Sequence, residues 1–271
     1  MDDGEKCVRR QSVCAGRWEG PMARIALLAD IHGNGPALDA VLSDVRDVGA
    51  DSVVCLGDVV GYGPDPEKCV EDVHTSCDQL VMGNHDEAVL IESTADLFNE
   101  NARAAIHFCR EQLSDWSMTL LKLMPYAVQV EDVSITHGSF GVDRFEYLYT
   151  AEAASFAFEG MLTRVGAVGH THLPSVFTCP GDAQPTPDNV RVFPVNGAVR
   201  CRLPEDRRVI VNPGSVGQPR DRNPDASWAL IDTSSMIFEV RRVAYDIDSV
   251  TSRILELGLP ASHGHRLRVG T

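Results

Sequence analysis

Short apolar runs alternate with helix-forming segments along the first two-thirds of this chain. Residues 52–56, Ser-Val-Val-Cys-Leu, are rich in β-branched side chains and are followed by a glycine and Asp58. Such a run is typical of a buried parallel strand. Residues 36–48 carry apolar side chains at helical spacing, with Asn34 as a helix cap and Gly49 as a stop. The alternation predicts parallel strands joined by helices.

Five strand-like runs end in polar side chains that can bind metal ions. The runs are residues 25–29, 52–56, 80–83, 133–136 and 165–169. They lead into Asp30-Ile31-His32, Gly57-Asp58, Asn84-His85-Asp86, His137-Gly138 and His170-Thr171-His172. Open α/β sheets bind ligands at the carboxyl ends of their strands. We therefore expect these side chains to form one site, in which Asp58 bridges two cations.

Similar patterns predict the remaining elements. Helices are expected at residues 66–75, 151–161 and 246–258 and within 86–124, where 99–113 is the clearest segment. A hairpin is expected between residues 126–130 and 133–136. Beyond residue 172, closely spaced runs at 175–179, 190–196, 208–211, 228–231 and 237–244 predict a second, largely antiparallel or mixed sheet. Residues 59–66 predict a loop over the site, and residues 179–188 a mobile surface insertion.

The pattern also sets the expected domain limits. Residues 1–22 lack periodicity and end just before the first strand, so we predict a disordered extension. Residues 23–259 are expected to form a single domain, which suits a chain of 271 residues. Residues 260–271 are expected to be a loose tail.

Charge and composition narrow the class of protein. The net charge of −15 argues against an extended basic track for nucleic acid and favours a monomeric or weakly associating surface, although it does not decide the oligomeric state. It does not argue against a phosphate substrate, because bound divalent ions reverse the local potential. We find no apolar stretch long enough to span a bilayer and no apolar core of a secretory signal, so we expect a cytoplasmic enzyme without a membrane partner.

The strand-end residues define the candidate chemistry. Carboxylate, imidazole and amide groups suit hard or borderline divalent ions, whereas no cysteine stands at these strand ends to make a thiolate site. Two such ions about 3.5–4 Å apart can clamp a phosphate and activate a water molecule. Among the other histidines, His74, His107, His263 and His265 are expected to be structural or on the surface.

The ordered motifs resemble those of the calcineurin-like metallophosphoesterase superfamily, in particular its small bacterial and archaeal members. This resemblance implies an α/β fold in which two mixed β-sheets pack as a sandwich flanked by helices. It implies two divalent metal ions, with Mn²⁺ first and Fe, Zn or Ni as alternatives. The implied ligands are Asp30, His32, Asp58 and His172 for one ion, and Asp58, Asn84, His137 and His170 for the other.

The same resemblance suggests further roles. His85 would face the leaving group as general acid or transition-state stabiliser, with Asp86 as its orienting partner, or Asp86 would instead cap the following helix. The Asn-Pro-Gly-Ser segment at residues 212–215 also resembles the subfamily, and Arg220 beyond it would contact a substrate phosphate or remain solvated. Tyr62 would stack on a base or merely pack.

Three functions stay open on this evidence. The first is a phosphodiesterase or phosphomonoesterase that acts on small phosphorylated molecules, with nucleotides as the leading class. The second is a dinucleoside polyphosphate hydrolase or a phosphoprotein phosphatase, although the Gly-Asp-x-Val-Asp-Arg-Gly motif of those enzymes is replaced after Asp58 by residues that include no arginine. The third is a non-catalytic scaffold of the same fold, which would be expected to have lost ligands.

Overall fold

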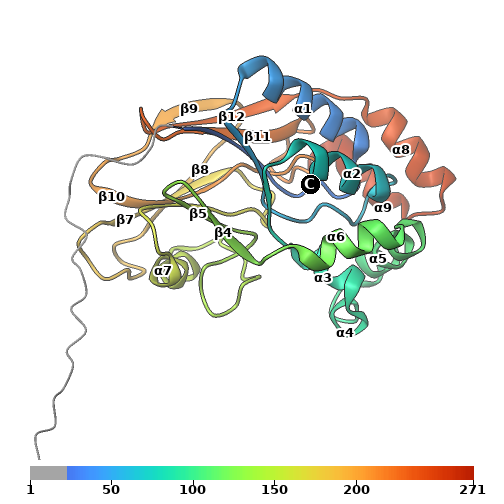
Figure 1. Cartoon of the computed structure of the whole chain (residues 1–271), viewed down its shortest axis with the longest axis horizontal. Coiled ribbons are helices and arrows are strands. Elements are labelled where there is room, and N and C mark those ends of the chain that lie inside the picture. Colours follow the sequence, from blue (N-terminus) through green and yellow to red (C-terminus); the bar gives the residue numbers. More distant parts are fainter. Residues whose placement is uncertain (1–22) are drawn as a thin grey trace, which may run out of the picture.

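Two six-stranded β-sheets lie at the centre of the molecule, with helices on their outer sides (Figure 1). The computed structural model describes residues 23–271. Residues 1–22, for which a disordered extension is predicted, lie outside the described residues. The arrangement confirms the predicted α/β fold of two mixed sheets packed as a sandwich.

The first sheet has the strand order β3-β2-β1-β11-β12-β9. Its strands are β1 (Arg24–Leu28), β2 (Ser52–Cys55), β3 (Gln79–Leu80), β9 (Val199–Arg202), β11 (Ala226–Asp232) and β12 (Ile237–Val243). The first three strands are parallel, so that Leu28 pairs with Cys55 of β2 and Cys55 with Leu80 of β3. The other three are joined by antiparallel pairing, which makes the sheet mixed.

The second sheet has the strand order β4-β5-β6-β10-β7-β8. Its strands are β4 (Ala127–Val130), β5 (Val133–Thr136), β6 (Val165–Ala167), β7 (Ser175–Pro180), β8 (Arg191–Pro194) and β10 (Arg207–Asn212). The predicted hairpin is confirmed, since β4 and β5 pair antiparallel. Strands β5, β6 and β10 are parallel to one another.

Alternation along the strands divides the core into layers. Ile25 and Leu27 of β1 join a buried cluster with Val209 of β10, which fills the space between the sheets. Ala26 and Leu28 point to the opposite face and pack with helices. The central strand β1 is therefore buried on both faces, as its apolar run predicts.

Helices cover the two outer faces. They are α1 (Gly35–Val48), α2 (Pro66–Ser76), α3 (Asn84–Leu90), α4 (Glu92–Ala95), α5 (Glu100–Gln112), α6 (Asp115–Leu123), α7 (Ala151–Gly160), α8 (Ile247–Glu256) and α9 (Ala261–Val269). Asn34 caps α1 as predicted, because its side chain accepts from the Ala37 N–H at 3.2 Å. α7 packs on the second sheet, where Phe158 joins a cluster with Ile210. No helix among residues 23–271 combines the length and apolar character needed to cross a membrane.

The strands beyond residue 172 do not form a sheet of their own, which corrects the sequence prediction. β7, β8 and β10 extend the sheet that contains β4 to β6, whereas β9, β11 and β12 extend the sheet that contains β1. β11 pairs directly with β1, so both halves of the chain contribute to both sheets. A strand's apolar alternation identifies the element but does not specify its neighbour.

The loose tail predicted for residues 260–271 is also wrong. Helix α9 packs against α8, and Leu267 lies in a buried cluster with Ile254 of that helix. Gly270 ends α9 with a left-handed backbone, φ 66°, as glycine commonly does at helix ends. His263, expected on the surface or in a structural place, is buried, and its Nδ1 lies 3.2 Å from the carbonyl oxygen of Tyr62. The end of the chain therefore supports the loop after β2.

Candidate metal centre

Sharp backbone turns at the strand ends bring the predicted residues together. Several of these residues have positive φ angles, which only glycine adopts freely, although aspartate and histidine enter this region more often than most residues. They are Asp30 (55°), His32 (50°), Asp58 (53°), His170 (66°) and His172 (60°). Backbone strain of this kind clusters at functional sites. Its recurrence here marks the site independently of residue type.

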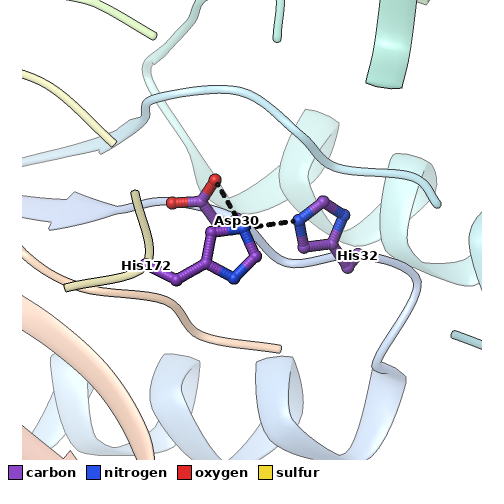
Figure 2. Close-up of side chains that lie close together, drawn as sticks. All are labelled: Asp30, His32 and His172. Atoms are coloured by element: carbon purple, nitrogen blue, oxygen red, sulfur yellow. Dashed lines mark hydrogen bonds and ion pairs between the residues drawn. The ribbon is translucent and has the colours of Figure 1, made fainter. Parts of the chain in front are cut away.

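Asp30, His32 and His172 form the first group of side chains. The two histidine Nε2 atoms lie 3.1 Å apart, and His172 Nε2 lies 3.5 Å from Asp30 Oδ1. Figure 2 shows the two rings and the carboxylate converging on one point. Asp30 follows β1 and His172 follows β6, so the group joins the two sheets.

The hydrogen bonds of these rings fit a bound cation. Nδ1 of His32 lies 3.1 Å from the carbonyl oxygen of Val60, and Nδ1 of His172 lies 2.6 Å from that of Gln218. A carbonyl only accepts, so each Nδ1 carries the hydrogen. Burial lowers the pKa of both histidines well below the ordinary value, so both rings are neutral. Two Nε2 lone pairs then face each other, an arrangement that a divalent cation relieves and that metal-binding histidines commonly show.

The second group lies beyond the ends of β2, β3, β5 and β6. His137 Nε2 lies 3.3 Å from Asp58 Oδ2, 3.1 Å from His170 Nδ1 and 3.1 Å from Asn84 Oδ1. Nδ1 of His137 lies 2.7 Å from the carbonyl oxygen of Leu56, which again leaves Nε2 to face the group. Carboxylate, imidazole and amide oxygen thus converge as the resemblance implies.

Asp58 lies between the two groups. Its Oδ2 is 3.6 Å from His32 Nε2 and 3.3 Å from His137 Nε2. Its Oδ1 accepts the His85 backbone N–H at 2.8 Å, which fixes the orientation of the carboxylate. One oxygen therefore faces a side chain from each group, as a bridging ligand requires.

The electrostatics of the site are those of buried, crowded charges. Burial raises the pKa of Asp30 to about 7. Burial acts in the same direction on Asp58, but neighbouring histidines, His137 first, hold the pKa of that carboxyl well below its ordinary value. Burial alone would lower the pKa of His137, yet the Asp58 carboxylate raises it to about 9. His137 must lose this proton to bind a metal ion, so metal binding is coupled to proton release.

His85 lies beside the candidate ligands, and its ring is surrounded by other rings. Its ring centroid is 4.7 Å from that of His32, 4.6 Å from Tyr62 and 4.7 Å from Phe98. Gly61 leaves room for this ring, because a Cβ there would lie 2.5 Å from His85 Nδ1. Burial lowers the pKa of His85 to about 4, so the imidazole is neutral at neutral pH. The ring is held beside the candidate ligands by shape rather than by an ion pair.

Asp86 does not orient His85 in the way that the resemblance suggests. Its Oδ2 accepts the backbone N–H groups of Asp58 at 2.8 Å and Gly83 at 3.0 Å, and its Oδ1 accepts that of Val60 at 3.2 Å. The contact with Gly83 caps α3, which is the alternative role considered from sequence. Asp86 therefore fixes the loop that carries Asp58.

Arg220 and Tyr62, the predicted substrate-binding residues, both lie beside the cluster. Burial is the main cause of the pKa shifts of Asp30, His32 and His172. The positive charge of Arg220 lowers the pKa of all three, so the guanidinium lies near them. Burial raises the pKa of Tyr62, and the nearby guanidinium opposes that shift. Arg220 donates through one terminal nitrogen to Gln218 Oε1 at 3.1 Å. The arginine is thus held close to the candidate ligands with donors that can meet an anion.

The segment at residues 212–218 supports the centre from behind. The Ser215 hydroxyl donates to the carbonyl oxygen of Asp30 at 2.7 Å, and the Gln218 carbonyl accepts from His172. The Asn212 side chain donates to the carbonyl oxygen of Gly169 at 2.6 Å. The segment thus holds the turns that carry the ligands, and its own side chains lie behind them.

Sequence reasoning missed two tyrosines at the site. Tyr147 stacks on the ring of His170, with centroids 3.8 Å apart, and Tyr149 stacks on Tyr147. Their spacing around Leu148, just before the helix-capping Thr150, is the available sequence signal. It identifies two side chains on one side of an extended segment but not what they touch.

Comparisons with known proteins identify the family of this chain. The sequence model of the calcineurin-like phosphoesterase superfamily domain matches residues 23–236. An uncharacterised protein of Methanocaldococcus jannaschii is 33% identical over 251 residues, which cover 91% of this chain and 98% of that protein. The crystal structure of a metallophosphoesterase from Sphaerobacter thermophilus has a TM-score of 0.80 and 35% identity, covering 93% of this chain and all of the other. A hypothetical protein from Pyrococcus horikoshii shares the fold at 20% identity, with a TM-score of 0.71 and coverage of 92% and 98%.

Proposed function

This chain belongs to the calcineurin-like phosphoesterase superfamily, and from that premise we propose that it is a phosphoesterase that works with two divalent metal ions. Membership of the superfamily supports hydrolysis of phosphoester bonds. Mn²⁺ is the leading ion for a site of carboxylate, imidazole and amide ligands, with Fe, Zn or Ni as alternatives. Small phosphorylated molecules are the proposed substrates, with nucleotides first.

The position of Asp58 carries the proposal. Its Oδ2 lies within 3.6 Å of His32 Nε2 and within 3.3 Å of His137 Nε2, and these two histidines belong to different groups of ligands. We assign Asp30, His32, Asp58 and His172 to one ion and Asp58, Asn84, His137 and His170 to the other. Bound ions would supply charge to bind the phosphate and to activate water.

The remaining residues have roles that follow from their places. Arg220 is proposed to bind a non-bridging phosphate oxygen, because its guanidinium lies beside both Tyr62 and the ligands. His85 is proposed to face the leaving group, where its ring N–H would stabilise developing negative charge or its protonated form would donate a proton. Asp86 is proposed to position Asp58 through the loop N–H groups.

A scaffold function is disfavoured by the same observations. Each predicted ligand is present, and the seven side chains converge from both sheets. Phosphoprotein and dinucleoside polyphosphate hydrolysis are disfavoured by the loop after Asp58, where Gly61 and Tyr62 stand in a segment without arginine.

A substrate panel tests the proposal. Metal-stripped protein is refilled separately with Mn²⁺, Ni²⁺, Zn²⁺ and Mg²⁺ and assayed on phosphomonoesters, phosphodiesters, diadenosine tetraphosphate and a phosphopeptide. We expect turnover of a small mono- or diester that returns with a transition metal. Full hydrolysis of bis-p-nitrophenyl phosphate by the metal-stripped protein would contradict metal dependence.

A further inference from the structure

We propose that Tyr147 and Tyr149 form a stacking platform for a planar aromatic group of the substrate. This inference rests on the proposed phosphoesterase function and adds the chemical class of the substrate. The organic part of the phosphate ester would be an aromatic ring system, from either a nucleobase or an aryl group. We call the two residues the tyrosine platform.

The tyrosine platform adjoins the candidate metal centre directly. The Tyr147 ring lies over the ring of His170 with centroids 3.8 Å apart and planes tilted by 25°. Tyr149 lies nearly parallel to Tyr147, with centroids 5.4 Å apart and planes 6° apart. The ring of Tyr149 ends the stack, so a further ring would lie on its outer face, with both tyrosine rings between it and His170. A phosphate joined to that ring through a spacer such as a ribose would extend back toward the centre.

The local backbone holds both tyrosines in place. Leu148, between them, is buried with Phe158 of α7 in the core under that helix. The backbone N–H of Tyr149 donates to the carbonyl oxygen of Tyr147 at 3.0 Å. Thr150 then caps α7 by accepting the Ala153 N–H at 3.2 Å. Because Leu148 is anchored, the neighbouring rings lie outside the core. The segment is already ordered, so less conformational entropy is lost when a ligand binds.

Exposure separates the tyrosine platform from core aromatics. Tyr147 is 44% exposed and Tyr149 is 50% exposed, whereas Phe158 and Trp228 are fully buried. An aromatic ring that packs only to stabilise the fold is usually buried, as Phe158 and Trp228 are. Two parallel, half-exposed rings next to buried charges offer apolar faces to a ligand.

Charge near the tyrosine platform supports a phosphate ester as the ligand. Burial raises the pKa of both Tyr147 and Tyr149, and the nearby guanidinium of Arg220 opposes both shifts. After burial, which is the main cause of their pKa shifts, the same guanidinium lowers the pKa of Asp30 and His172 in the first group of ligands. Arg220 therefore lies near both the metal centre and the tyrosine platform, where it can bind phosphate while a planar group stacks.

Equilibrium binding tests this inference without relying on turnover. The full-length protein, loaded with Mn²⁺ and carrying His85→Ala so that esters survive, is titrated by calorimetry. The probes are adenosine 5′-monophosphate, phenyl phosphate and ribose 5-phosphate. We expect adenosine 5′-monophosphate to bind at least about 5-fold more tightly than ribose 5-phosphate, as expected for one stacked base.

Variants of Tyr149 isolate the ring itself. Tyr149→Leu keeps apolar volume but removes the ring, and should weaken adenosine 5′-monophosphate roughly 5- to 150-fold while ribose 5-phosphate is unchanged. Tyr149→Phe should keep the preference. Phe156→Leu is the matched control, because Phe156 is 52% exposed on α7, close in sequence to the tyrosine platform. It should change none of the three affinities.

The outcomes are distinguishable. Weaker binding of the adenosine compound alone would assign the tyrosine platform to nucleobases, and weaker binding of phenyl phosphate as well would assign it to aromatic rings generally. Equal affinity for all three probes, unchanged in Tyr149→Leu and in a Tyr147→Leu/Tyr149→Leu protein of normal metal content, would overturn the inference. Failure of the wild-type protein to hydrolyse any ester would instead count against the proposed function and leave these binding results intact.

Discussion

Three histidines of the candidate metal centre, His32, His137 and His172, have their ring orientations fixed by backbone carbonyls. Leu56, Val60 and Gln218 each present a carbonyl oxygen to the Nδ1 of a different histidine. The Nδ1 partners are backbone carbonyl oxygens and not side chains, so the loops that carry the candidate ligands also orient the rings. Partners of this kind commonly change metal affinity 10- to 100-fold.

Loss of the His85 ring should affect the reaction more than metal binding. For His85→Ala we expect both metal ions to stay bound while kcat falls by about 10²- to 10⁴-fold, because a proton donor or N–H donor to the leaving group is removed. Metal content and kcat are measured together, with His107→Ala as control, since His107 is exposed on α5. Loss of a metal ion along with activity would instead make His85 a ligand, a place that its proximity to His32 and Asp58 allows.

The close approach of two loops at Gly83 gives a second prediction. A Cβ at this position would lie 2.1 Å from Asp58 Oδ1 and 2.3 Å from Asp58 N, although φ at Gly83 is an ordinary −90°. Gly83→Ala should therefore displace the Asp58 carboxylate and weaken Mn²⁺ binding by about 10- to 100-fold. Gly197→Ala is the control: an added Cβ there meets nothing within 4 Å, so the only cost is the backbone strain of its φ of 72°, which should not change Mn²⁺ affinity. Equal Mn²⁺ affinities in the Gly83 variant and the wild type would refute this steric account.

Individual elements are fastened by polar contacts away from the site. Arg241 of β12 donates to both carboxylate oxygens of Asp44 on α1, at 2.8 and 3.0 Å. Trp228 of β11 donates to the same carboxylate at 2.9 Å. One aspartate therefore joins α1 to two strands of the first sheet, and α1 begins just after His32.

This contact should give stability that depends on pH. The hydrogen bonds from Arg241 hold the pKa of Asp44 below its ordinary value of 3.8. A lowered folded-state pKa stabilises the fold above the unfolded pKa, and this contribution is lost as the pH falls through the folded-state pKa. We expect Asp44→Asn to lower the free energy of unfolding by about 1 to 3 kcal/mol at pH 7. In urea unfolding at several pH values, the difference from wild type should shrink below pH 3.8. A difference that stayed constant down to the lowest pH would contradict the role of the carboxylate charge.

On the scale of the whole molecule, the sequence predicted which candidate ligands lie together better than it predicted the connections between elements. Asp30, Asp58 and His137 could be placed together because each follows an apolar run, and parallel strands bring such ends to one edge. The distribution of later strands between two sheets depends on long-range pairing such as that of β11 with β1, which local alternation does not encode.

Other features escaped prediction for related reasons. Helix α9 is stabilised by packing on α8, and its few apolar residues give a weak pattern on their own. The use of Asp86 by three backbone N–H groups depends on two loops that meet only in the folded chain. Tyr147 touches His170 across a separation of 23 residues, so the contact follows from the fold and not from spacing.

The measurement that tests the central claim most directly is the number of Mn²⁺ ions bound per chain by wild type and by Asp58→Ala. Metal-stripped proteins are dialysed to equilibrium against Mn²⁺ and analysed for metal, with thermal unfolding to check the fold. Asp248→Ala is the control, since that carboxylate is 84% exposed. The bridging role predicts two ions in the wild type and the control, and loss of both tight sites together in Asp58→Ala. Two ions retained by a folded Asp58→Ala protein would contradict a shared metal centre.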